Sequence, residues 1–502
     1  MQQPNYENIS LSTTLQLFCE KVKVESKTEI PSGAVVRVLE TNAFASVTES
    51  RAEEGSLYVG GKVIYQIFYQ DDESVLRKYE CGSEFSTTIK DDSILSTDKS
   101  EITLSIDKTA IDLSGAKANV SAVLNVCTHL KRNVLLSVVG SGDGLVVNRT
   151  DKQLTKSLGI CSSNYPIQEE FELSYPVKEM LTNTVSCVVT NAQCGVGCII
   201  VDGELIFNGL VVKNDDDRTL VKENRVFPFR VEIEHGDAMP SLLAIAKGGV
   251  KTFKTDVSVD PDENKSVATL SVTFHFFGEV VATEQITYPT DSFSVSENLE
   301  LGMENVSVCY PLELISHTTN LNGRATREEI AEEIKVVGTG GEKIEITSTK
   351  IDGDKLCVEG VLSVNTYLLG DNQKKTSVLL ETPFTTTIER VESSELSFEV
   401  VANVKSSNAR RVSLTEWDIE GEVVFTIYPY KTDSIKYLKE VKGVGEKQIE
   451  DRAISVYIAI EGEELWDLSK RLNVCPNELV LTNKELQFPL SGKERIVIYR
   501  QK

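Results

Sequence analysis

Apolar and polar residues alternate with a period of two along most of the first 450 residues of the chain. Val, Ile, Thr, Phe and Tyr dominate these stretches, and turn residues such as Asp71-Asp72 and Gly370-Asp371-Asn372 separate them. Strict alternation places every second side chain on one face, so the pattern predicts half-buried β-strands. We therefore expect a mainly β chain, built from antiparallel sheets that face each other as sandwiches or open barrels.

One strand pattern occurs three times in the chain. The three copies share a glycine in mid-strand, at Gly61, Gly203 and Gly360. A second matching strand follows each glycine after about 25 residues, and it begins at Phe85, Phe229 or Phe384. A pair of long alternating strands then completes each copy. Three landmarks in the same order predict tandem copies of one domain, over residues 1–148, 149–304 and 305–450. A glycine in mid-strand indicates a bulge or a close backbone crossing.

The last fifty residues have a different pattern. A short alternating strand runs into Gly462, and four residues at helical spacing follow it: Leu465, Leu468, Ser469 and Leu472. Asn473 and Pro476 end this helix, and a second short helix ends near Asn483. A final strand covers Arg495–Tyr499. The order strand, helix, helix, strand predicts a small α+β domain over residues 453–502.

The order and spacing of this segment resemble a LysM module, a small fold best known for holding N-acetylated glycans such as peptidoglycan. The resemblance rests on the Gly462-x-x-Leu465-Trp466 turn, on the asparagine that closes the second helix, and on Gly492 before the last strand. It implies a binding surface for a partner or glycan on the first helix, its turn and the end of the second helix. The candidate residues are Gly462, Glu463, Glu464, Leu465, Trp466, Lys470, Arg471 and Asn483.

The turn before the first helix departs from the LysM pattern. Glycan-binding modules usually have Gly-Asp-Thr-Leu there, whereas this chain has Gly462-Glu463-Glu464-Leu465. Two carboxylates suit the first turn of a helix, but they add bulk and negative charge where a sugar would approach the backbone. We interpret Trp466 as a packing residue of the small core. Two ligands stay open for this segment, namely a protein partner and peptidoglycan.

A LysM module behind tandem β-domains resembles the SPOCS-domain proteins of endospore-forming bacteria, in particular spore-coat morphogenetic proteins of the SipL type. The shared strand pattern and the ending Gly492–Tyr499 carry this resemblance, which covers nearly the whole chain. It implies a scaffold in the mother-cell cytoplasm that helps attach the basement layer of the coat to the forespore surface. It also implies that the LysM module contacts the coat-forming morphogenetic ATPase.

Composition narrows the class of partner. The chain of 502 residues has 76 acidic and 52 basic residues, a net charge of −24. Nucleic acids and anionic membrane surfaces require basic patches, so we expect neither as the main partner. The first residues lack the charged and apolar regions of a signal peptide, and no stretch approaches a membrane span, so we expect a cytoplasmic protein without membrane insertion. Ten scattered cysteines, Cys127, Cys187 and Cys357 among them, are interpreted as reduced.

Motifs for catalysis are weak, and we expect no enzyme, cofactor or metal. The four histidines, His129, His235, His275 and His317, do not accompany a nucleophile motif. Gly140–Gly144 has glycine where a nucleophile elbow needs serine, so it is interpreted as a hinge. Gly338–Lys343 lacks the spacing of a phosphate loop and is interpreted as a helix-ending turn after a helix that begins near Thr326. Cys194 and Cys198 alone are too few ligands to predict zinc.

Overall fold

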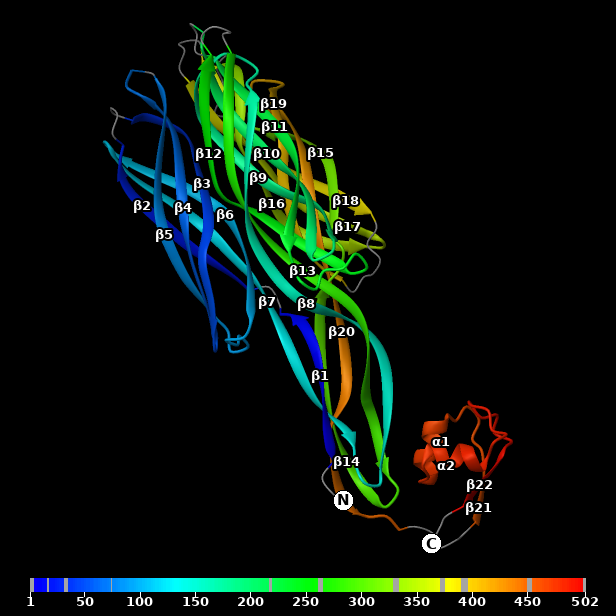
Figure 1. The fold of residues 1–502 in the computed structure, drawn as a ribbon. Helices are drawn as coiled ribbons and strands as arrows, with labels where there is room; N and C mark the ends of the chain where they lie inside the picture. The colour runs from blue at the N-terminus through cyan, green and yellow to red at the C-terminus, as the bar shows by residue number, and fades with distance from the viewer. Residues whose placement is uncertain are drawn as a thin grey trace.

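The computed structural model describes residues 4–15, 18–30, 35–73, 75–215, 219–260, 265–327, 334–370, 375–389, 396–448 and 454–499. Within these ranges the chain forms seven sheets, and every strand pair is antiparallel. The expected mainly β class with antiparallel sheets is confirmed. Figure 1 shows three bundles of strands at one end, a narrow neck, and a small helical unit at the other end.

The first pair of sheets, which we call the first head, contains six of the N-terminal strands. One sheet has the order β3-β4-β5, with bounds Val35–Glu53, Ser56–Asp71 and Leu76–Lys90. The other places β7 between β2 and β6, with bounds Lys117–Ser141, Phe18–Glu29 and Lys99–Ser114. Alternating apolar residues of both sheets, such as Tyr65 and Leu124, form one core between them.

The second head has the same strand order. Its sheets are β9-β10-β11, with bounds Val177–Cys194, Cys198–Lys213 and Leu220–Glu234, and β8-β13-β12, with bounds Leu145–Glu172, Lys265–Ser294 and Leu243–Asp260. Phe274 and Phe276 lie fully buried in its core. In this head a single long strand, β8, takes the place that the first head gives to two strands in succession.

The third head repeats the order again. Its sheets are β16-β17-β18, with bounds Ile334–Asp352, Lys355–Gly370 and Lys375–Glu389, and a sheet in which β20 (Glu416–Glu446) lies between β15 (Ile315–Thr326) and β19 (Leu396–Arg411). Trp417 is fully buried at the centre of its core. The sequence landmarks therefore fall on equivalent strands of three sheet pairs.

The shared glycines lie where one sheet strand is bulged. Gly61, Gly203 and Gly360 pair directly with Phe85, Phe229 and Phe384. On the opposite side the neighbouring strand skips one residue of the register at the same level: Thr48, Thr190 or Thr347. A Cβ on any of these glycines would collide with the phenylalanine ring and with a carbonyl oxygen of the bulged strand. The glycine is therefore required by close packing, which confirms the interpretation as a bulge.

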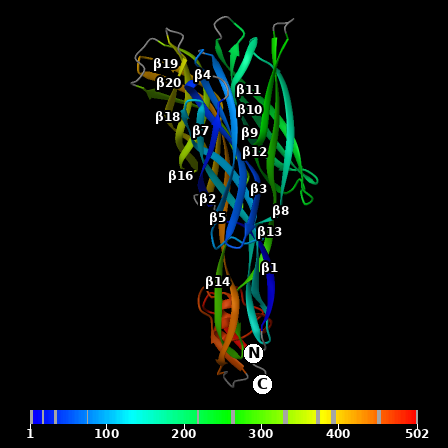
Figure 2. The ribbon, with the colours of Figure 1, turned by 90° about the vertical axis from the view of Figure 1, so that its left-hand side faces the viewer.

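A narrow stem continues from the heads. β1 (Asn5–Thr14) pairs with the second half of β7, the first half of β8 pairs with the second half of β13, and β14 (Glu297–Pro311) pairs with the second half of β20. Figures 1 and 2 show these three strand pairs running side by side away from the heads. Val138, Tyr288, Tyr310 and Tyr437 meet in a common core, so the stem joins all three parts of the chain.

The heads pack against each other through apolar and polar contacts. Leu39, Phe68, Leu210 and Tyr367 belong to one buried cluster with members from all three heads. The rings of Phe68 and Tyr367 lie 5.6 Å apart in an edge-to-face arrangement. Beside this cluster the ammonium group of Lys222 bonds to the third head at Glu342, Thr339 and Ser407. The heads therefore form a single body.

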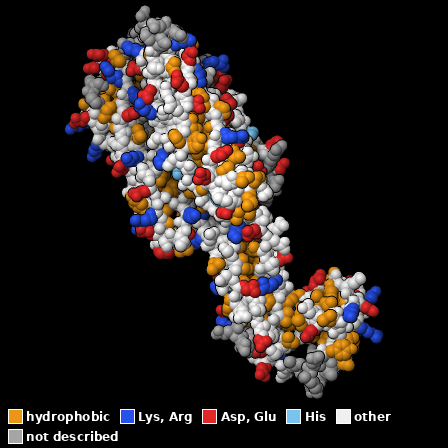
Figure 3. All heavy atoms as spheres, in the orientation of Figure 1, with side chains coloured by type: hydrophobic (Ala, Val, Ile, Leu, Met, Phe, Trp, Pro, Cys, Tyr) orange, Lys and Arg blue, Asp and Glu red, His pale blue; other side chains and the backbone are white. Residues whose placement is uncertain are grey.

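The C-terminal tail, residues 454–499, is a separate small unit. It contains β21 (Ile454–Ile458), α1 (Leu465–Leu472), α2 (Pro476–Thr482) and β22 (Arg495–Tyr499), in the expected order. β21 and β22 pair with each other, and Leu468, Leu472, Leu479 and Ile496 lie in the tail's own core. Figure 3 shows apolar side chains gathered on the visible face of the tail. No helix in the described ranges is long and apolar enough to cross a membrane.

Three expectations about local structure are wrong. Thr326, where the helix was expected to begin, is the last residue of β15, and Ile334, Val337 and Gly338 lie in strand β16; residues 328–333 of the predicted helix lie outside the described residues. Pairing with β17 outweighs the local helical pattern. Gly338–Lys343 is accordingly a bulged part of β16 and no helix-ending turn. Gly140 and Ser141 end β7, and a tight turn at residues 142–145 leads directly into β8, closed by the bond from the Leu145 N–H to the Gly142 oxygen; the expected hinge is thus a turn between two stem strands.

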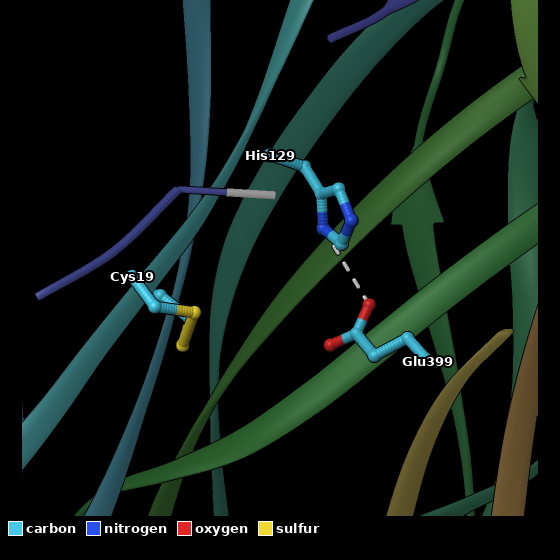
Figure 4. The surroundings of a disulfide bond; sticks show 4 residues. Cys19, His129 and Glu399 are labelled. Atoms are coloured by element: carbon cyan, nitrogen blue, oxygen red, sulfur yellow. Dashed lines mark ion pairs between the residues drawn. A yellow bond between two sulfur atoms is a disulfide. The ribbon is translucent and has the colours of Figure 1, made fainter. Parts of the chain in front are cut away.

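The expectation of reduced cysteines is wrong at one place. Cys19 on β2 and Cys127 on β7 are directly opposite each other in the register, and they form a disulfide with Cα atoms 4.1 Å apart (Figure 4). Direct cross-strand neighbours bring the two sulfur atoms within bonding distance. The remaining cysteines of the described residues, including Cys187 and Cys357, are free.

Candidate functional site

The turn that leads into α1 uses its backbone groups inside the tail. Gly462 adopts a φ of 79°, which lets the chain turn sharply out of β21. Its N–H donates to the Leu490 oxygen at 2.8 Å, and the Leu490 N–H donates to the Glu463 oxygen at 3.0 Å. The loops before α1 and after α2 are therefore bonded to each other, and these amides and carbonyls are not directed at a ligand.

The two carboxylates of the turn have different roles. Glu463 is buried, and its oxygens accept bonds from the Arg471 guanidinium at 2.7 and 2.8 Å. These bonds lower the pKa of Glu463 and raise that of Arg471. Glu464 occupies the N-cap position of α1 and is exposed. Of the two carboxylates expected at the surface, only Glu464 is exposed, because Glu463 turns inward and pairs with the Arg471 guanidinium.

Trp466 lies outside the core of the tail, so its interpretation as a packing residue of that core is wrong. Its ring packs edge-on against Phe293 of β13, with centroids 5.3 Å apart, and its indole N–H donates to a carboxylate oxygen of Asp291 at 2.9 Å. The ammonium of Lys470 donates to the same carboxylate at 2.6 and 2.7 Å. Two predicted ligand-binding residues of α1 therefore hold the tail against the tip of the stem.

The end of α1 strengthens this contact. Asn473 has a φ of 56° and closes the helix, and its amide donates to the Val295 oxygen at 2.5 Å. Lys447, just after β20, donates to the Asn473 side-chain oxygen and to the Ser294 oxygen, each at 2.7 Å. We call this contact the tail–stem joint; its members are Asp291, Phe293, Val295, Lys447, Trp466, Lys470 and Asn473. The sequence contains no signal for Asp291, Phe293 and Val295, which lie more than a hundred residues before α1.

The last two candidate residues support the tail itself. Leu465 is partly buried against the tail core. The side-chain oxygen of Asn483 accepts a bond from the Val497 N–H at 2.7 Å, and its amide donates to the Val497 oxygen at 2.8 Å. Asn483 therefore fastens the end of α2 to the outer edge of β22. Of the eight predicted residues, Gly462 and Glu464 are exposed and contribute only backbone bonds to the tail, to Leu490 and Leu468.

The most exposed apolar surface of the tail lies on β21, which the candidate set did not include. Ile454, Val456, Ile458 and Ile460 are 55–72% exposed, and Tyr499, the partner of Ile454 on β22, is 60% exposed. Alternation explains the arrangement, since the intervening Tyr457 faces the core of the tail. The alternating pattern was visible in the sequence, but it did not reveal that the outward face would hold the branched residues. We call this surface the β21 face.

A second cluster of charged residues lies where the three heads meet. Glu101 and His129 of the first head and Glu399 of the third offer ligand atoms within 4.8 Å of one another, which is a spacing that a metal ion would need. The ammonium of Lys247, from the second head, already forms ion pairs with both carboxylates. Figure 4 shows His129 directed at Glu399, 3.5 Å away. The donor set is therefore satisfied by a lysine from within the chain.

Burial and charge set the ionisation of this junction. Burial, together with the nearby Lys247, lowers the pKa of His129 to about 4, so the imidazole is neutral at pH 7. Burial opposes the charge on Lys247, but Glu101 and Glu399 outweigh it and raise the lysine's pKa well above its usual value. Lys131 adds a buried ion pair with Glu279 at 2.9 Å. These groups neutralise one another across the heads, and we call them the ionic junction.

Together these features define an elongated antiparallel β protein that carries a small α+β unit on the tip of its stem. No protein-family model matches the chain, and no curated protein is significantly similar to it. Its function has to be argued from its own surfaces.

Proposed function

We propose that the chain is a non-enzymatic scaffold for spore-coat assembly of the SipL type, with its C-terminal tail as a LysM domain that docks a protein. In this proposal the three heads, with their stem strands, are SPOCS-like domains over residues 1–148, 149–304 and 305–450, and the LysM domain covers residues 453–502. The partner is the morphogenetic ATPase of the coat basement layer. The place of action is the mother-cell side of the forespore surface.

The β21 face is the observation that carries this proposal. Large exposed apolar patches on a folded chain mark sites of association, and most side chains of this one come from β21. The tail stands at the far end of the stem, where a bulky partner can approach it without meeting the heads (Figure 1). The backbone groups of the Gly462 turn, which glycan recognition would use, are bonded within the tail. A protein surface fits these features better than a sugar does.

Peptidoglycan binding is the second candidate, and one observation favours it. Because Glu463 is buried and paired with Arg471, Glu464 is the one exposed carboxylate of the turn at residues 462–465. The electrostatic objection to a sugar at this turn is therefore weaker than the sequence indicates. Glu464 is the residue to change if the chain sediments with peptidoglycan.

A paired binding assay on the full chain tests the proposal. Purified protein is offered immobilised coat ATPase and, separately, insoluble peptidoglycan. We expect capture by the ATPase and loss of capture in Ile458→Asp, which places a charge at the most exposed residue of the β21 face, Ile458 at 72%. Val196→Asp is the matched control, since Val196 is 86% exposed in the turn between β9 and β10. Sedimentation with peptidoglycan without ATPase capture would overturn the scaffold proposal in favour of the second candidate.

A further inference from the structure

The direction of the backbone groups of β21 follows from the bonds of its neighbour. Both the N–H and the C=O of Val497 bond to the side chain of Asn483, on the side of β22 that faces away from β21. Val497 is the register partner of Val456, so this pair exchanges no bonds. The N–H and C=O of Val456 consequently point away from β22. The Ala459 N–H bonds to the Glu494 oxygen on the other side, which agrees with this alternation.

The tail sheet therefore has one closed and one open edge. Asn483 satisfies the outer edge of β22 at Val497, so a further strand cannot add there without displacing it. Among the described residues, β22 is the only strand that pairs with β21. Ile454, Val456 and Ile458 all direct their backbone groups to the open edge, because direction alternates along a strand. Natural proteins usually guard such an edge with a charge or a proline, and β21 has neither.

The side chains at the open edge show what would pair with it. The same three residues, Ile454, Val456 and Ile458, place apolar side chains on the outward face of the sheet. Arg495, the register partner of Ile458, is exposed on β22 and has no ion-pair partner among the described residues. An added strand would thus meet a row of branched apolar groups with one positive charge at the Ile458 end. Its complement is an alternating apolar segment that begins with a carboxylate.

We propose that the open edge of β21 binds an extended segment of a partner protein as an added antiparallel strand, with apolar side chains on the β21 face and an acidic residue near Arg495. This inference rests on the proposed function and names the mode of docking. Main-chain bonds then supply affinity, and the alternate side chains supply specificity. Trp466 and Lys470, the residues of α1 expected to contact a partner, are already used in the tail–stem joint. A second copy of the chain is the less favoured occupant, because each copy brings a net charge of −24.

A designed peptide tests the open edge in the full-length protein. The probe is a fluorescein-labelled peptide of sequence Glu-Thr-Val-Thr-Val-Thr-Val, and its binding is followed by fluorescence anisotropy. In the proposed register the valine N–H groups face β21 and the threonine N–H groups face away. Methylation of the valine nitrogens should weaken binding at least tenfold, whereas methylation of the threonine nitrogens should leave it within about twofold. A peptide with Lys in place of Glu should bind more weakly.

Protein variants test the same geometry from the other side. Val456→Pro removes one N–H that faces the open edge and no bond of the β21–β22 pair, so the tail should fold while peptide affinity falls at least tenfold. Circular dichroism and the melting curve check the fold. Val456→Thr keeps the N–H and the branched shape and should bind nearly as well as the wild type. Val196→Lys, in the β9–β10 turn, is the remote control.

The outcomes separate the inference from the proposed function. Equal binding of the two methylated peptides, or unchanged peptide affinity in a folded Val456→Pro variant, would overturn strand addition. If such a variant still captures the coat ATPase, the scaffold proposal stands and the docking mode is wrong. If the peptide binds but the ATPase is not captured, strand addition at β21 is supported and the ATPase is not the partner. A dimer in analytical ultracentrifugation that Val456→Pro dissolves would make a second copy the occupant and overturn the heterologous partner.

Discussion

A single glycine sets the packing of each head. Gly203 pairs with Phe229, whose ring covers the space that a side chain would fill, and the bulged Thr190 lies beside it on β9. The Thr190 hydroxyl bonds back to the Asp202 oxygen at 3.1 Å, and Thr347 makes the equivalent bond to Glu359 at 3.2 Å. The combination of bulge, glycine and aromatic ring thus recurs in all three heads, and a bulge of this kind bends the strand that carries it.

Gly203→Ala should destabilise the protein. The new Cβ would meet the Val188 carbonyl oxygen and the Phe229 ring, and backbone cannot move aside as a flexible side chain can. Overpacking of this kind costs about 1–3 kcal/mol. Gly249→Ala in β12 is the control, since a Cβ there has no neighbour within 4 Å. Thermal unfolding compares the two variants, and an equal loss in both would show that the crowding at Gly203 is unimportant.

Because of His129, the free energy of unfolding should fall as the pH is lowered. Its folded pKa of about 4 lies below the unfolded value near 6.5, so the unfolded state binds the proton first as pH falls. The histidine's contribution is present above pH 6.5 and is lost progressively between about pH 6.5 and 4. The groups around it are Lys247, Lys131, Glu101, Glu399 and the Tyr430 ring.

His129→Gln isolates this effect from that of the surrounding carboxylates. Wild type should lose up to about 3 kcal/mol more than the variant on going from pH 7 to pH 4, from the size of the pKa difference. Melting temperatures measured for both proteins across this range provide the comparison. Parallel pH curves would mean that the imidazole accepts its proton without disturbing the junction.

At the scale of elements, the tail–stem joint decides how α1 is presented. Its contacts join one short helix to the end of β13 and to the segment after β20, through Asp291, Phe293 and Lys447. The Asp291 carboxylate accepts bonds from the Trp466 indole N–H and from the Lys470 ammonium group. Hydrogen bonds to a charged acceptor are strong, and two of them fix the orientation of α1 on the stem. The helix is thereby held by the stem, and the sheet of the tail faces outward.

Asp291→Ala should loosen the joint. It removes the hydrogen-bond acceptor of the Trp466 indole and the ion-pair partner of Lys470. We expect the free energy of the tail–stem contact to weaken by about 1–3 kcal/mol, since the site is partly exposed to solvent. Tryptophan fluorescence reports the change, because Trp417 is fully buried in the third head and only Trp466 lies at the joint. We expect a red shift and stronger quenching by acrylamide. Trp466→Phe identifies the signal, and unchanged emission in Asp291→Ala would show that the contact does not hold the tail.

The strands and helices were more predictable from the sequence than the contacts between them. Strands such as β4 and β10 and the order of the tail were predictable, since they depend on local alternation and on caps. The predicted helix near Thr326 failed because Ile334 and Gly338 find strand partners in β17, a tertiary effect that no local pattern shows. Trp466 was assigned to the wrong core for the same reason, as Phe293 is distant in sequence. The disulfide depended on the register of β2 against β7, which the sequence leaves open.

At the scale of the whole molecule, the ionic junction links all three heads. Lys247 comes from the second head, Glu101 from the first and Glu399 from the third, and all three are largely buried. Such a triad adds little stability over apolar packing, but it accepts only one arrangement of the heads. Removal of a single partner leaves uncompensated charge in the interior, and this gives the strongest test.

Lys247→Met should destabilise the protein by about 3–5 kcal/mol, because it leaves two buried carboxylates without their cation. The triple variant Lys247→Met, Glu101→Gln and Glu399→Gln removes the charges together and should recover much of that loss. If the junction unites the heads, calorimetry should show one transition in wild type and separated transitions in Lys247→Met. A single unshifted transition in Lys247→Met would instead assign the unity of the heads to the apolar cluster of Phe68, Leu210 and Tyr367.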